Sequence, residues 1–246
     1  MKKVRADKLL VESGLVPSRH EAQRRIMSGD VWLGDHRITK SGTLLPETAK
    51  LTLKGDALPY VSRGGLKLEA ALNAFQIDVR NLAALDIGAS TGGFTDCLLQ
   101  RGARRVYAVD VGYGQLDWTL RQDPRVVVIE RTNARYLTDE VIPEPIGVAV
   151  IDVSFISVKK IIPAIDDFLA PGSVTIILVK PQFEVGKGEV GKGGIVRDPE
   201  KHQRVLRDIT AFCKERGLAI LGHIPSPIRG AKGNREFLLA VRKPWE

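Results

Sequence analysis

The chain contains few cysteines, no long apolar run and no apolar segment at its start. Its two cysteines, Cys97 and Cys213, lie far apart in the sequence. They therefore indicate neither a disulfide framework nor a metal-binding cluster, and they fit a reducing compartment. The first residues, MKKVRADKLL, lack the apolar core of a secretory signal peptide, and no apolar run approaches the roughly 20 residues that span a membrane. These absences predict a soluble cytoplasmic protein without a membrane segment or a bound metal.

The composition allows a substantial core and shows an excess of positive charge. The chain has 246 residues, of which 43% are apolar, enough for one α/β domain and a small additional module. The net charge at pH 7 is +8. An excess of this size favours an anionic partner, nucleic acid rather than a membrane, although many basic proteins bind nothing acidic.

Residues 1–58 differ from the rest of the chain in charge and in pattern. They contain eleven Lys or Arg against seven Asp or Glu, hence +4 of the total charge of +8. Apolar spacing predicts a helix over residues 5–13 that stops at Gly14. Ser18, followed three positions later by Glu21, predicts a capping box that begins a second helix ending near Met27. The short alternating segments VWLG, HRIT and KLTL predict a small sheet after this helix–turn–helix.

The second predicted helix carries a group of cationic residues. By themselves they suit a solvated helix face as well as a nucleic-acid contact. The segment ADKLLVESGLVPSRHEAQRRIMSGDVWLGDHRI resembles the small RNA-binding module that is named after a small-subunit ribosomal protein and also occurs in pseudouridine synthases. This resemblance implies that the second helix contacts RNA phosphates. The residues expected to bind RNA in this part of the chain are Arg5, Lys8, Arg19, His20, Arg24, Arg25 and Arg63.

From residue 65 onward, strand and helix patterns alternate. Residues 59–64, which begin PYVSR, predict a linker between the two domains. Apolar runs predict seven strands, at 82–87, 106–111, 126–130, 147–153, 174–180, 218–223 and 236–241. Helical patterns lie between them, for example over 94–100, 158–168 and 199–216. This alternation predicts an α/β domain over residues 65–246, built on a Rossmann-like, doubly wound parallel sheet.

A glycine-rich turn follows the first predicted strand in ALDIGASTGGFTDCLL. Glycines there let the backbone approach a ligand closely, and the following helix N-terminus presents free N–H groups. Asp110 ends the next strand, 22 residues beyond Gly88, where a carboxylate accepts hydrogen bonds from ribose hydroxyls. The turn Gly88-Ala-Ser-Thr-Gly92-Gly93 does not have the Gly-x-Gly-x-x-Gly spacing of dinucleotide enzymes.

Two further residues favour S-adenosylmethionine as the cofactor. Asp86, just before the turn, disfavours a pyrophosphate and suits the cationic methionine portion, and Asn133 suits a contact with adenine. The alternative is that the glycines only pack a tight strand–helix turn. The expected cofactor-binding residues are Asp86, Gly88, Ser90, Gly92, Gly93, Phe94, Asp110, Val111, Asn133 and Asp152.

Charged residues stand where apolar strands end. The stretch TIILVKPQFEVGKGEVGKGG ends an apolar strand on Lys180, and VAVIDVSF ends another on Asp152. Parallel strands end at the ligand crevice, so both side chains should face the same cleft as Gly88. Lys67, in RGGLKLEAAL, and Glu236, in GNREFLL, flank this core. Taken singly, these two suit ordinary surface charges and Asp152 suits a turn cap, whereas a lysine that ends a buried strand has no such structural explanation.

These four residues resemble the Lys-Asp-Lys-Glu catalytic tetrad of the FtsJ-like ribose 2′-O-methyltransferases. The motifs DIGASTGGFTD, VDVGYGQL, DPRVVVIERTNAR, DVSFIS and VKPQFEVGKGEVGKGG more closely resemble the TlyA family, historically called hemolysin A, over nearly the whole chain. The resemblance implies S-adenosylmethionine-dependent methylation of a cytidine 2′-hydroxyl in ribosomal RNA. The chain ends at KPWE, whereas some members have a longer tail, which favours the large subunit as the substrate.

The glycine-rich loop after Lys180 has two interpretations. Lys187, Lys192 and Arg197 would contact phosphates as the loop closes over bound RNA, or the segment is an ordinary mobile surface loop. The spacing from Gly186 to Lys192 approaches that of a phosphate-binding NTPase loop, but the next residue is glycine instead of Ser or Thr.

Other functions stay open at this point. A base methyltransferase or a nicotinamide enzyme would use the same scaffold, but DVSF lacks the amide of an Asn-Pro-Pro-aromatic signature. A membrane-active cytolysin would need an amphipathic or apolar segment that the sequence does not show. A non-catalytic RNA-binding assembly factor would keep the fold, but the intact tetrad argues against it.

Overall fold

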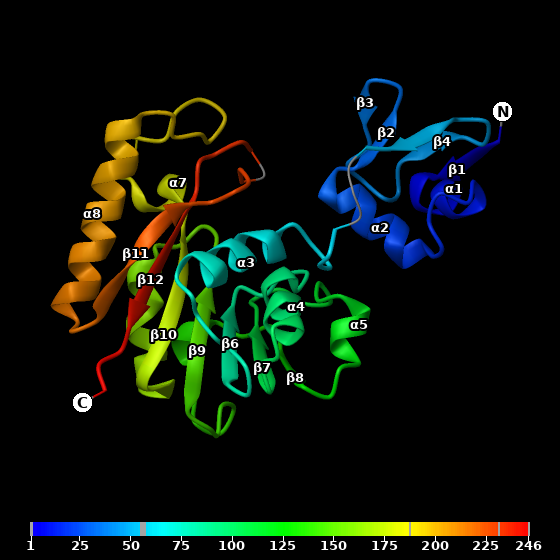
Figure 1. Ribbon diagram of the computed structural model, residues 1–246. Helices are drawn as coiled ribbons and strands as arrows, with labels where there is room; N and C mark the ends of the chain where they lie inside the picture. The colour runs from blue at the N-terminus through cyan, green and yellow to red at the C-terminus, as the bar shows by residue number, and fades with distance from the viewer. Residues whose placement is uncertain (1, 55–57, 187, 231, 246) are drawn as a thin grey trace. The chain divides into compact units, whose positions relative to one another are not determined.

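The computed structural model describes residues 2–54, 58–186, 188–230 and 232–245, without the side chain of His20. The chain forms two compact units, Met1–Arg63 and Gly64–Glu246, each of which is described by itself (Figure 1). The division falls within residues 59–64, the predicted linker, whose linker role stays a prediction.

The described residues of the first unit form two helices and two small antiparallel sheets. β1 (Lys3–Arg5) leads into α1 (Ala6–Glu12) and pairs with β4 (Leu44–Pro46). After α2 (Arg19–Ser28), strand β2 (Val31–Leu33) lies between β3 (His36–Arg37) and β5 (Leu51–Leu53). A core that includes Leu10, Ile26 and Val31 joins the helices to the sheets. The sequence predicted the similarly short β2, β3 and β5 but not β1 and β4.

Helix α2 begins and ends as its sequence predicts. The Ser18 side chain accepts a hydrogen bond from the Glu21 N–H at 3.1 Å, and Gly29 ends the helix in the left-handed region at φ 81°. The reciprocal half of the predicted capping box differs, because the Glu21 carboxylate contacts Arg24 and Arg25.

The second unit is built on a seven-stranded sheet with the order β11-β12-β10-β9-β6-β7-β8. The strands are β6 (Ala83–Ile87), β7 (Arg105–Val109), β8 (Val126–Ile129), β9 (Ile146–Ile151), β10 (Leu169–Val179), β11 (Ala219–Pro225) and β12 (Phe237–Arg242). β6 to β10 run parallel, but β12 is antiparallel to both β10 and β11. The prediction of a parallel sheet is therefore wrong for β12. The described residues before it, 226–230 and 232–236, form no crossover helix, and a parallel strand needs such a crossover.

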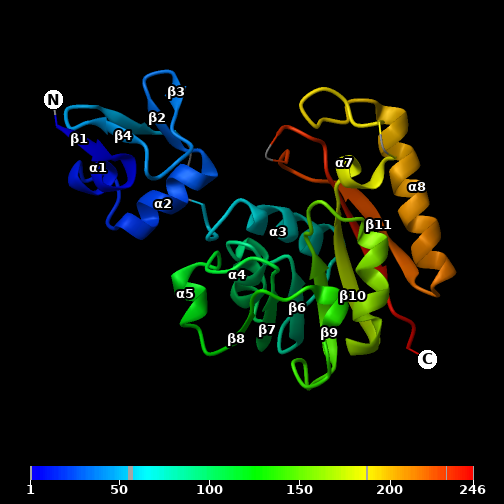
Figure 2. The same ribbon diagram turned by 180° about the vertical axis from the view of Figure 1, so that it is seen from behind.

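Helices cover both faces of this sheet (Figures 1 and 2). α3 (Gly64–Ala74) and α4 (Gly93–Gln100) contact each other and lie over one face. Side chains from α6 (Ile162–Ile165) and α8 (Pro199–Glu215) share a core with strand residues such as Leu85, Ile151 and Leu239 on the other face. The remaining short elements are α5 (Trp118–Arg121), α7 (Pro181–Glu184), η1 (Ala134–Tyr136), η2 (Val158–Lys160) and η3 (Asp166–Phe168). The sheet is thus doubly wound, as predicted.

The helix predicted over 158–168 is instead three short pieces, η2, α6 and η3. Pro163 lies in the first turn of α6. Proline has no N–H and clashes with the preceding turn, so a continuous helix does not pass through this position.

Candidate active site and RNA-binding residues

Three of the four tetrad residues lie at neighbouring strand ends on one edge of the sheet. Asp152 follows β9, Lys180 follows β10, and Glu236 immediately precedes β12. β10 and β12 are antiparallel, with Val179 opposite Phe237, so the next step along the two strands brings Lys180 and Glu236 side by side. This edge is formed by the carboxyl ends of the parallel strands, where ligands bind in such folds.

Lys180, which is buried, forms an ion pair with the half-buried Asp152. Its Nζ lies 2.6 Å from Asp152 Oδ1, and the two side chains are 11% and 22% exposed. The same Nζ donates a hydrogen bond to Ser154 Oγ at 2.9 Å. Among the described residues, no donor is aligned for a hydrogen bond to Asp152 Oδ1. Its contact with Lys180 is therefore electrostatic, and this oxygen can still accept a hydrogen bond.

Lys67 and Glu236, both buried, form a second ion pair. Lys67 projects from α3, and its Nζ donates to Glu236 Oε2 at 2.6 Å, with the side chains 11% and 3% exposed. Gly230, in the loop before β12, packs so closely that a β-carbon there would collide with Glu236 Oε1. The structure therefore joins the tetrad as two ion pairs, Lys180–Asp152 and Lys67–Glu236.

The glycine turn after β6 touches the end of β9. Gly88 has φ +86°, and a β-carbon on it would lie 2.5 Å from the backbone oxygen of Asp152. Its N–H donates to Val109 O at 2.8 Å, and the Asp152 N–H donates to Ile87 O at 2.9 Å. Only glycine fits this position, because both its φ and its space exclude a side chain. The predicted cofactor turn and the Lys180–Asp152 pair are therefore adjacent.

Asp86 lies beneath this turn and is fully buried. Thr95 Oγ1 donates to its Oδ2 at 2.7 Å, whereas Oδ1 has no hydrogen-bond partner among the described residues. Burial raises the pKa of this carboxyl to about 7, partly offset by the Thr95 hydrogen bond. A buried carboxyl with an unused oxygen suits a cationic ligand group more than an anionic one.

Asp110, at the end of β7, is held by backbone donors. Its Oδ2 accepts from the Ser90 N–H at 2.8 Å and its Oδ1 from the Gly112 N–H at 2.7 Å. Each oxygen keeps a second lone pair for a ribose hydroxyl. The neighbouring Val111 side chain is 71% exposed. Asn133 is the N-cap of η1, and its side-chain oxygen accepts a hydrogen bond from the Arg135 N–H.

The start of α4 supplies the other predicted cofactor contacts. Gly92 has φ +95°, and a β-carbon there would collide with Leu116 and Leu120. Gly93 begins the helix, whose first turn receives no side-chain cap. The Phe94 side chain is buried, with 3% exposed, so its side chain packs in the interior and only its backbone faces the turn.

These features fit S-adenosylmethionine. The glycine turn leaves room beside the backbone, the first turn of α4 has uncapped N–H groups for a carboxylate, and Asp86 has an unpaired buried oxygen. Asp86, Gly88, Gly92 and Gly93 would hold the methionine portion, and Asp110 the ribose. Among the described residues, no group of three His, Cys, Asp or Glu side chains could hold a metal ion.

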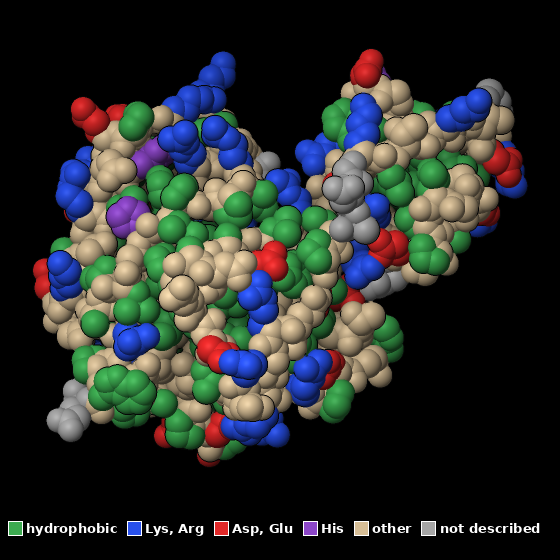
Figure 3. Space-filling model, viewed as in Figure 1, with side chains coloured by type: hydrophobic (Ala, Val, Ile, Leu, Met, Phe, Trp, Pro, Cys, Tyr) green, Lys and Arg blue, Asp and Glu red, His purple; other side chains and the backbone are tan. Residues whose placement is uncertain are grey.

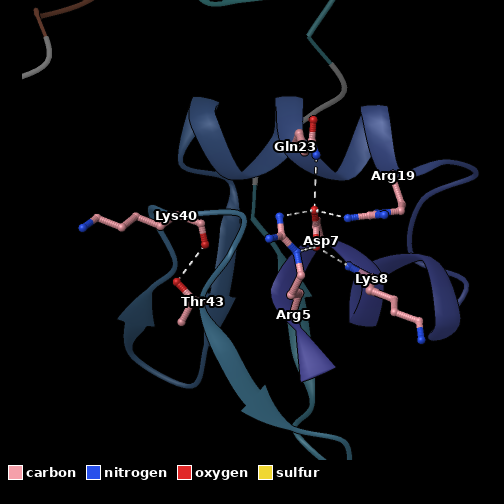
Figure 4. A network of polar contacts seen from close by, with 7 residues as sticks. All are labelled: Arg5, Asp7, Lys8, Arg19, Gln23, Lys40 and Thr43. Carbon is pink, nitrogen blue, oxygen red and sulfur yellow. Dashed lines mark hydrogen bonds and ion pairs between the residues drawn. The ribbon is translucent and has the colours of Figure 1, made fainter. Parts of the chain in front are cut away.

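In the first unit, four of the arginines expected to bind RNA are already paired with acids. Arg5 and Arg19 both contact the buried Asp7 (Figure 4). Arg24 pairs with Glu21, and Arg25 lies 3.1 Å from Asp30 with a side chain only 12% exposed.

Lys8, paired with Glu12 at 3.3 Å, remains 57% exposed, and Arg63 is half-buried. Arg25 is thus the least accessible of the four predicted RNA-binding arginines that form these ion pairs. The His20 side chain lies outside the described part of the chain.

The glycine-rich loop is fastened at several points. Glu189 accepts from the Gly186 N–H at 3.0 Å and binds Arg204 at 2.7 Å. The buried Asn234 accepts from the Val196 N–H at 3.0 Å and donates to Gly194 O at 2.9 Å. Lys192 and Arg197 are exposed, whereas Lys187 lies outside the described residues. Much of this loop is therefore tied to α8 and to the segment that leads to Glu236.

The sequence reasoning missed several basic residues near this loop. Figure 3 shows Lys and Arg side chains gathered over the loops that precede α8 and β12. Arg229, Lys232 and Arg235, from the second of these loops, are exposed. The signal for them was the sequence IRGAKGNRE, in which every third residue is basic. Ser154, which binds Lys180, was also missed, because a serine after a strand has no distinguishing pattern.

No helix of the described residues has the length and apolar character that a membrane crossing requires. The sequence profile of the FtsJ-like methyltransferases matches residues 60–243. The profile of the S4 domain matches residues 4–49.

Full-length relatives support the same assignment. The chain is 52% identical over 249 residues to YqxC of Bacillus subtilis (strain 168), a match that covers 100% of this chain and 88% of the relative. It is 46% identical over 242 residues to the 16S/23S rRNA (cytidine-2'-O)-methyltransferase TlyA of Mycobacterium tuberculosis (strain ATCC 25618 / H37Rv), covering 98% and 90%. A solved structure from Streptococcus thermophilus superposes with a TM-score of 0.78 at 46% identity, covering 99% and 90% of the two chains. The chain therefore belongs to the TlyA group of FtsJ-like methyltransferases and contains an S4 domain.

Proposed function

We propose that this chain transfers the methyl group of S-adenosylmethionine to the ribose 2′-oxygen of a cytidine in ribosomal RNA. The supporting observation is the two ion pairs at one edge of the sheet, Lys180–Asp152 and Lys67–Glu236, beside the glycine turn. Removing two charges from water costs free energy that their attraction often does not repay, so a role in stability explains these pairs less well than a role in the chemistry. The substrate class follows from the name of the Mycobacterium relative.

The chemistry requires a 2′-hydroxyl to lose its proton as its oxygen attacks a methyl carbon. S-adenosylmethionine, when bound, supplies that methyl on a positively charged sulfur. Lys180 acts in one of two ways. As an ammonium group it stabilises the negative charge that develops on the oxygen while the hydroxyl proton passes to water, or, once it has lost its own proton, it accepts the hydroxyl proton as a neutral amine. Ser154 Oγ, 2.9 Å from Nζ, accepts a hydrogen bond that directs the ammonium group, and Asp152, 2.6 Å from Nζ, attracts it by charge. Positioned acid–base catalysis of this kind contributes about 10²- to 10⁴-fold in rate.

Lys67 and Glu236 have an orienting role in this proposal. Their pair lies next to Lys180 across the β10–β12 ladder, so both can hydrogen-bond the ribose that carries the reacting hydroxyl. Correct alignment of the two reactants supplies several kcal/mol of the barrier reduction. The residues proposed to hold the cofactor are Asp86, Gly88, Ser90, Gly92, Gly93, Phe94, Asp110, Val111, Asn133 and Asp152.

RNA binding is assigned to two groups of basic residues, one in each unit. Arg5, Lys8 and Arg19 in the S4 domain and Lys192 and Arg197 in the glycine-rich loop are exposed and suit phosphate contacts. The large ribosomal subunit is the proposed source of the cytidine, and the cytoplasm, where ribosomes assemble, is the proposed location.

Mapping 2′-O-methyl groups on ribosomal RNA from cells with and without this gene tests the proposal. A cytidine methylated only when the gene is present supports it, and its place in the large or small subunit decides the subunit. Identical maps in the two strains would contradict the proposed activity and would favour a non-catalytic assembly factor. Lysis of red cells by the purified protein in the absence of S-adenosylmethionine would favour the cytolysin alternative.

A further inference from the structure

A buried carboxylate lies under the exposed arginines of the S4 domain. Asp7, in the first turn of α1, has 0% of its surface exposed. Arg5 donates to it through Nε at 3.0 Å and Nη2 at 2.9 Å. Arg19, at the start of α2, donates at 3.1 Å, and Gln23, one turn later on α2, donates at 3.2 Å. One anion therefore joins side chains from β1 and α2 (Figure 4).

The hydrogen bonds account for both oxygens of Asp7. Oδ1 accepts from Arg5 and from the Lys8 N–H at 2.9 Å, and Oδ2 accepts from Arg5, Arg19 and Gln23. The hydrogen bond from Arg5 lowers the pKa of this carboxyl far below its usual range. The group is therefore an anion at neutral pH, compensated by two guanidinium groups.

The two arginines keep donors for another ligand. A guanidinium group has five N–H donors, and Asp7 uses two from Arg5 and one from Arg19. The side chains of Arg5 and Arg19 remain 46% and 58% exposed. Arg5 also packs against Gly42, where a β-carbon would lie 3.4 Å from its Nη1. The guanidinium groups of Arg5 and Arg19 are thus fixed in direction and still open to solvent.

Fixing these side chains in advance changes the cost of binding. A free arginine loses rotamer freedom when it contacts a phosphate, and that loss weakens binding. A guanidinium group that a carboxylate already holds has lost this freedom before the RNA binds. Its remaining N–H donors then point in a fixed direction and can bind a phosphate. The anion also repels a nearby phosphate, so ordering and charge act in opposite directions.

We propose that Asp7 is a positioning residue that holds Arg5 and Arg19 in a preformed, two-arginine site for ribosomal RNA phosphates. Ordering outweighs repulsion, because the carboxylate is buried behind both guanidinium groups and each of them stands between it and solvent. This inference rests on the proposed RNA-methylating function and adds to it the residue that organises RNA recognition.

Whether Asp7→Asn weakens or strengthens RNA binding distinguishes the ordering of the arginines from the repulsion by the carboxylate. The full-length Asp7→Asn variant removes one negative charge from the RNA-binding unit but keeps the size of the side chain. Binding to purified large ribosomal subunits that lack the modification is measured over a range of salt concentrations. We expect the Kd to rise about three- to tenfold, and the magnitude of the slope of log K against log[salt] to fall by about 1, because about one phosphate contact is lost. Tighter binding with an equal or steeper slope would overturn the proposal.

Glu47→Gln is the matched control. It removes the same charge from the same unit, but Glu47 is 51% exposed and pairs with Lys2 at 3.0 Å, away from Asp7. We expect its Kd to stay within about twofold of wild type. A rise equal to that of Asp7→Asn would overturn the proposal, because loss of any acid would then suffice.

A double-mutant cycle separates positioning from a merely structural role. Arg5→Lys with Arg19→Lys keeps every charge but removes the forked contacts. In this background Asp7→Asn is expected to leave the Kd unchanged or to lower it. An equal rise in both backgrounds would show that Asp7 acts on the fold instead.

Thermal melting of each variant shows whether the S4 domain remains folded at the assay temperature. Should Asp7→Asn unfold it, the Arg5→Lys, Arg19→Lys protein decides the question alone: weaker binding at unchanged net charge supports the proposal, and wild-type affinity overturns it. A wild-type protein that binds no ribosomal RNA would instead contradict the proposed function itself, so the two failures are distinguishable.

Discussion

Gly88 and Asp152 meet so closely that a β-carbon on the glycine would lie 2.5 Å from the Asp152 backbone oxygen. Gly88 belongs to the turn proposed to hold the cofactor, and Asp152 pairs with Lys180. The methyl donor and the group that activates the acceptor are thus tied through one backbone contact. A change at residue 88 should affect both stability and methyl transfer.

Gly88→Ala tests this contact. Alanine at φ +86° costs about 1–2 kcal/mol, and the clash adds about 1–3 kcal/mol, so both the free energy of unfolding and the affinity for S-adenosylmethionine should fall. Denaturant titration and calorimetric binding measure the two effects. Gly217→Ala is the control, because Gly217 has a similar φ of +78° with nothing within 4 Å. Equal losses in both variants would contradict the account.

Replacing the Lys67–Glu236 pair with two apolar residues should preserve the stability of the protein but abolish its activity. Glu236→Leu leaves a buried ammonium group without its partner and should lower the free energy of unfolding by about 3 kcal/mol. Adding Lys67→Met should restore most of that loss, because an apolar pair of similar volume fills the site. Urea denaturation measures stability, and transfer of labelled methyl groups measures activity. Near wild-type activity in the double variant would make the pair purely structural.

Asp86 should make stability depend on pH. Its pKa is raised from 3.8 to about 7 in the folded protein, so the folded state holds this proton more tightly than the unfolded state. Protonated Asp86 therefore makes its full contribution to the free energy of unfolding below about pH 4. This contribution is lost as the pH rises to about 7, and the loss is at most about 4 kcal/mol. Relative to Asp86→Asn, the wild type should lose stability over this window and stay level above it. If the free energy of unfolding changed with pH in the same way for the two proteins from pH 4 to 8, the assignment would be contradicted.

Asn234 should control the glycine-rich loop. Asn234→Ala leaves the Val196 N–H and the Gly194 carbonyl without their partner, and an unpaired buried group costs about 1–3 kcal/mol. We expect faster proteolytic cleavage within residues 186–197 and a higher KM for ribosomal subunits. Asn73→Ala, at an exposed position on α3, is the control. Unchanged cleavage and KM in Asn234→Ala would show that the loop does not depend on this tie.

The sequence predicted the edge of the sheet where the site lies, but not its contacts. Lys180, Asp152 and Gly88 could be assigned to one edge because parallel strands end together. The direction of β12 could not, because apolar alternation is the same in both directions. Pro163, in the first turn of α6, was visible in the sequence as a helix breaker. One helix over residues 158–168 was predicted nevertheless, because the apolar spacing around it suits a helix.

The partner of a side chain depends on which elements pack together in the fold, and the periodicity of the sequence does not show this. Asp7 looks like an ordinary acid in a helix first turn, and only the approach of α2 shows that Arg19 and Gln23 reach it. Ser154 is similar, because its bond to Lys180 depends on a loop that turns at Phe155 with φ +65°. Asn133 illustrates the reverse case, since the side-chain oxygen expected to meet adenine already caps η1.

The most direct measurement is single-turnover transfer of labelled methyl from S-adenosylmethionine to unmodified ribosomal subunits by wild type, Lys180→Ala and Lys160→Ala. Lys160 is an exposed lysine of η2 and serves as the matched control. We expect label on a cytidine 2′-oxygen with wild type and Lys160→Ala, and a rate about 10²- to 10⁴-fold lower with Lys180→Ala, while that variant still folds and binds both substrates. A folded Lys180→Ala protein that transfers methyl groups at nearly the wild-type rate would contradict this expectation.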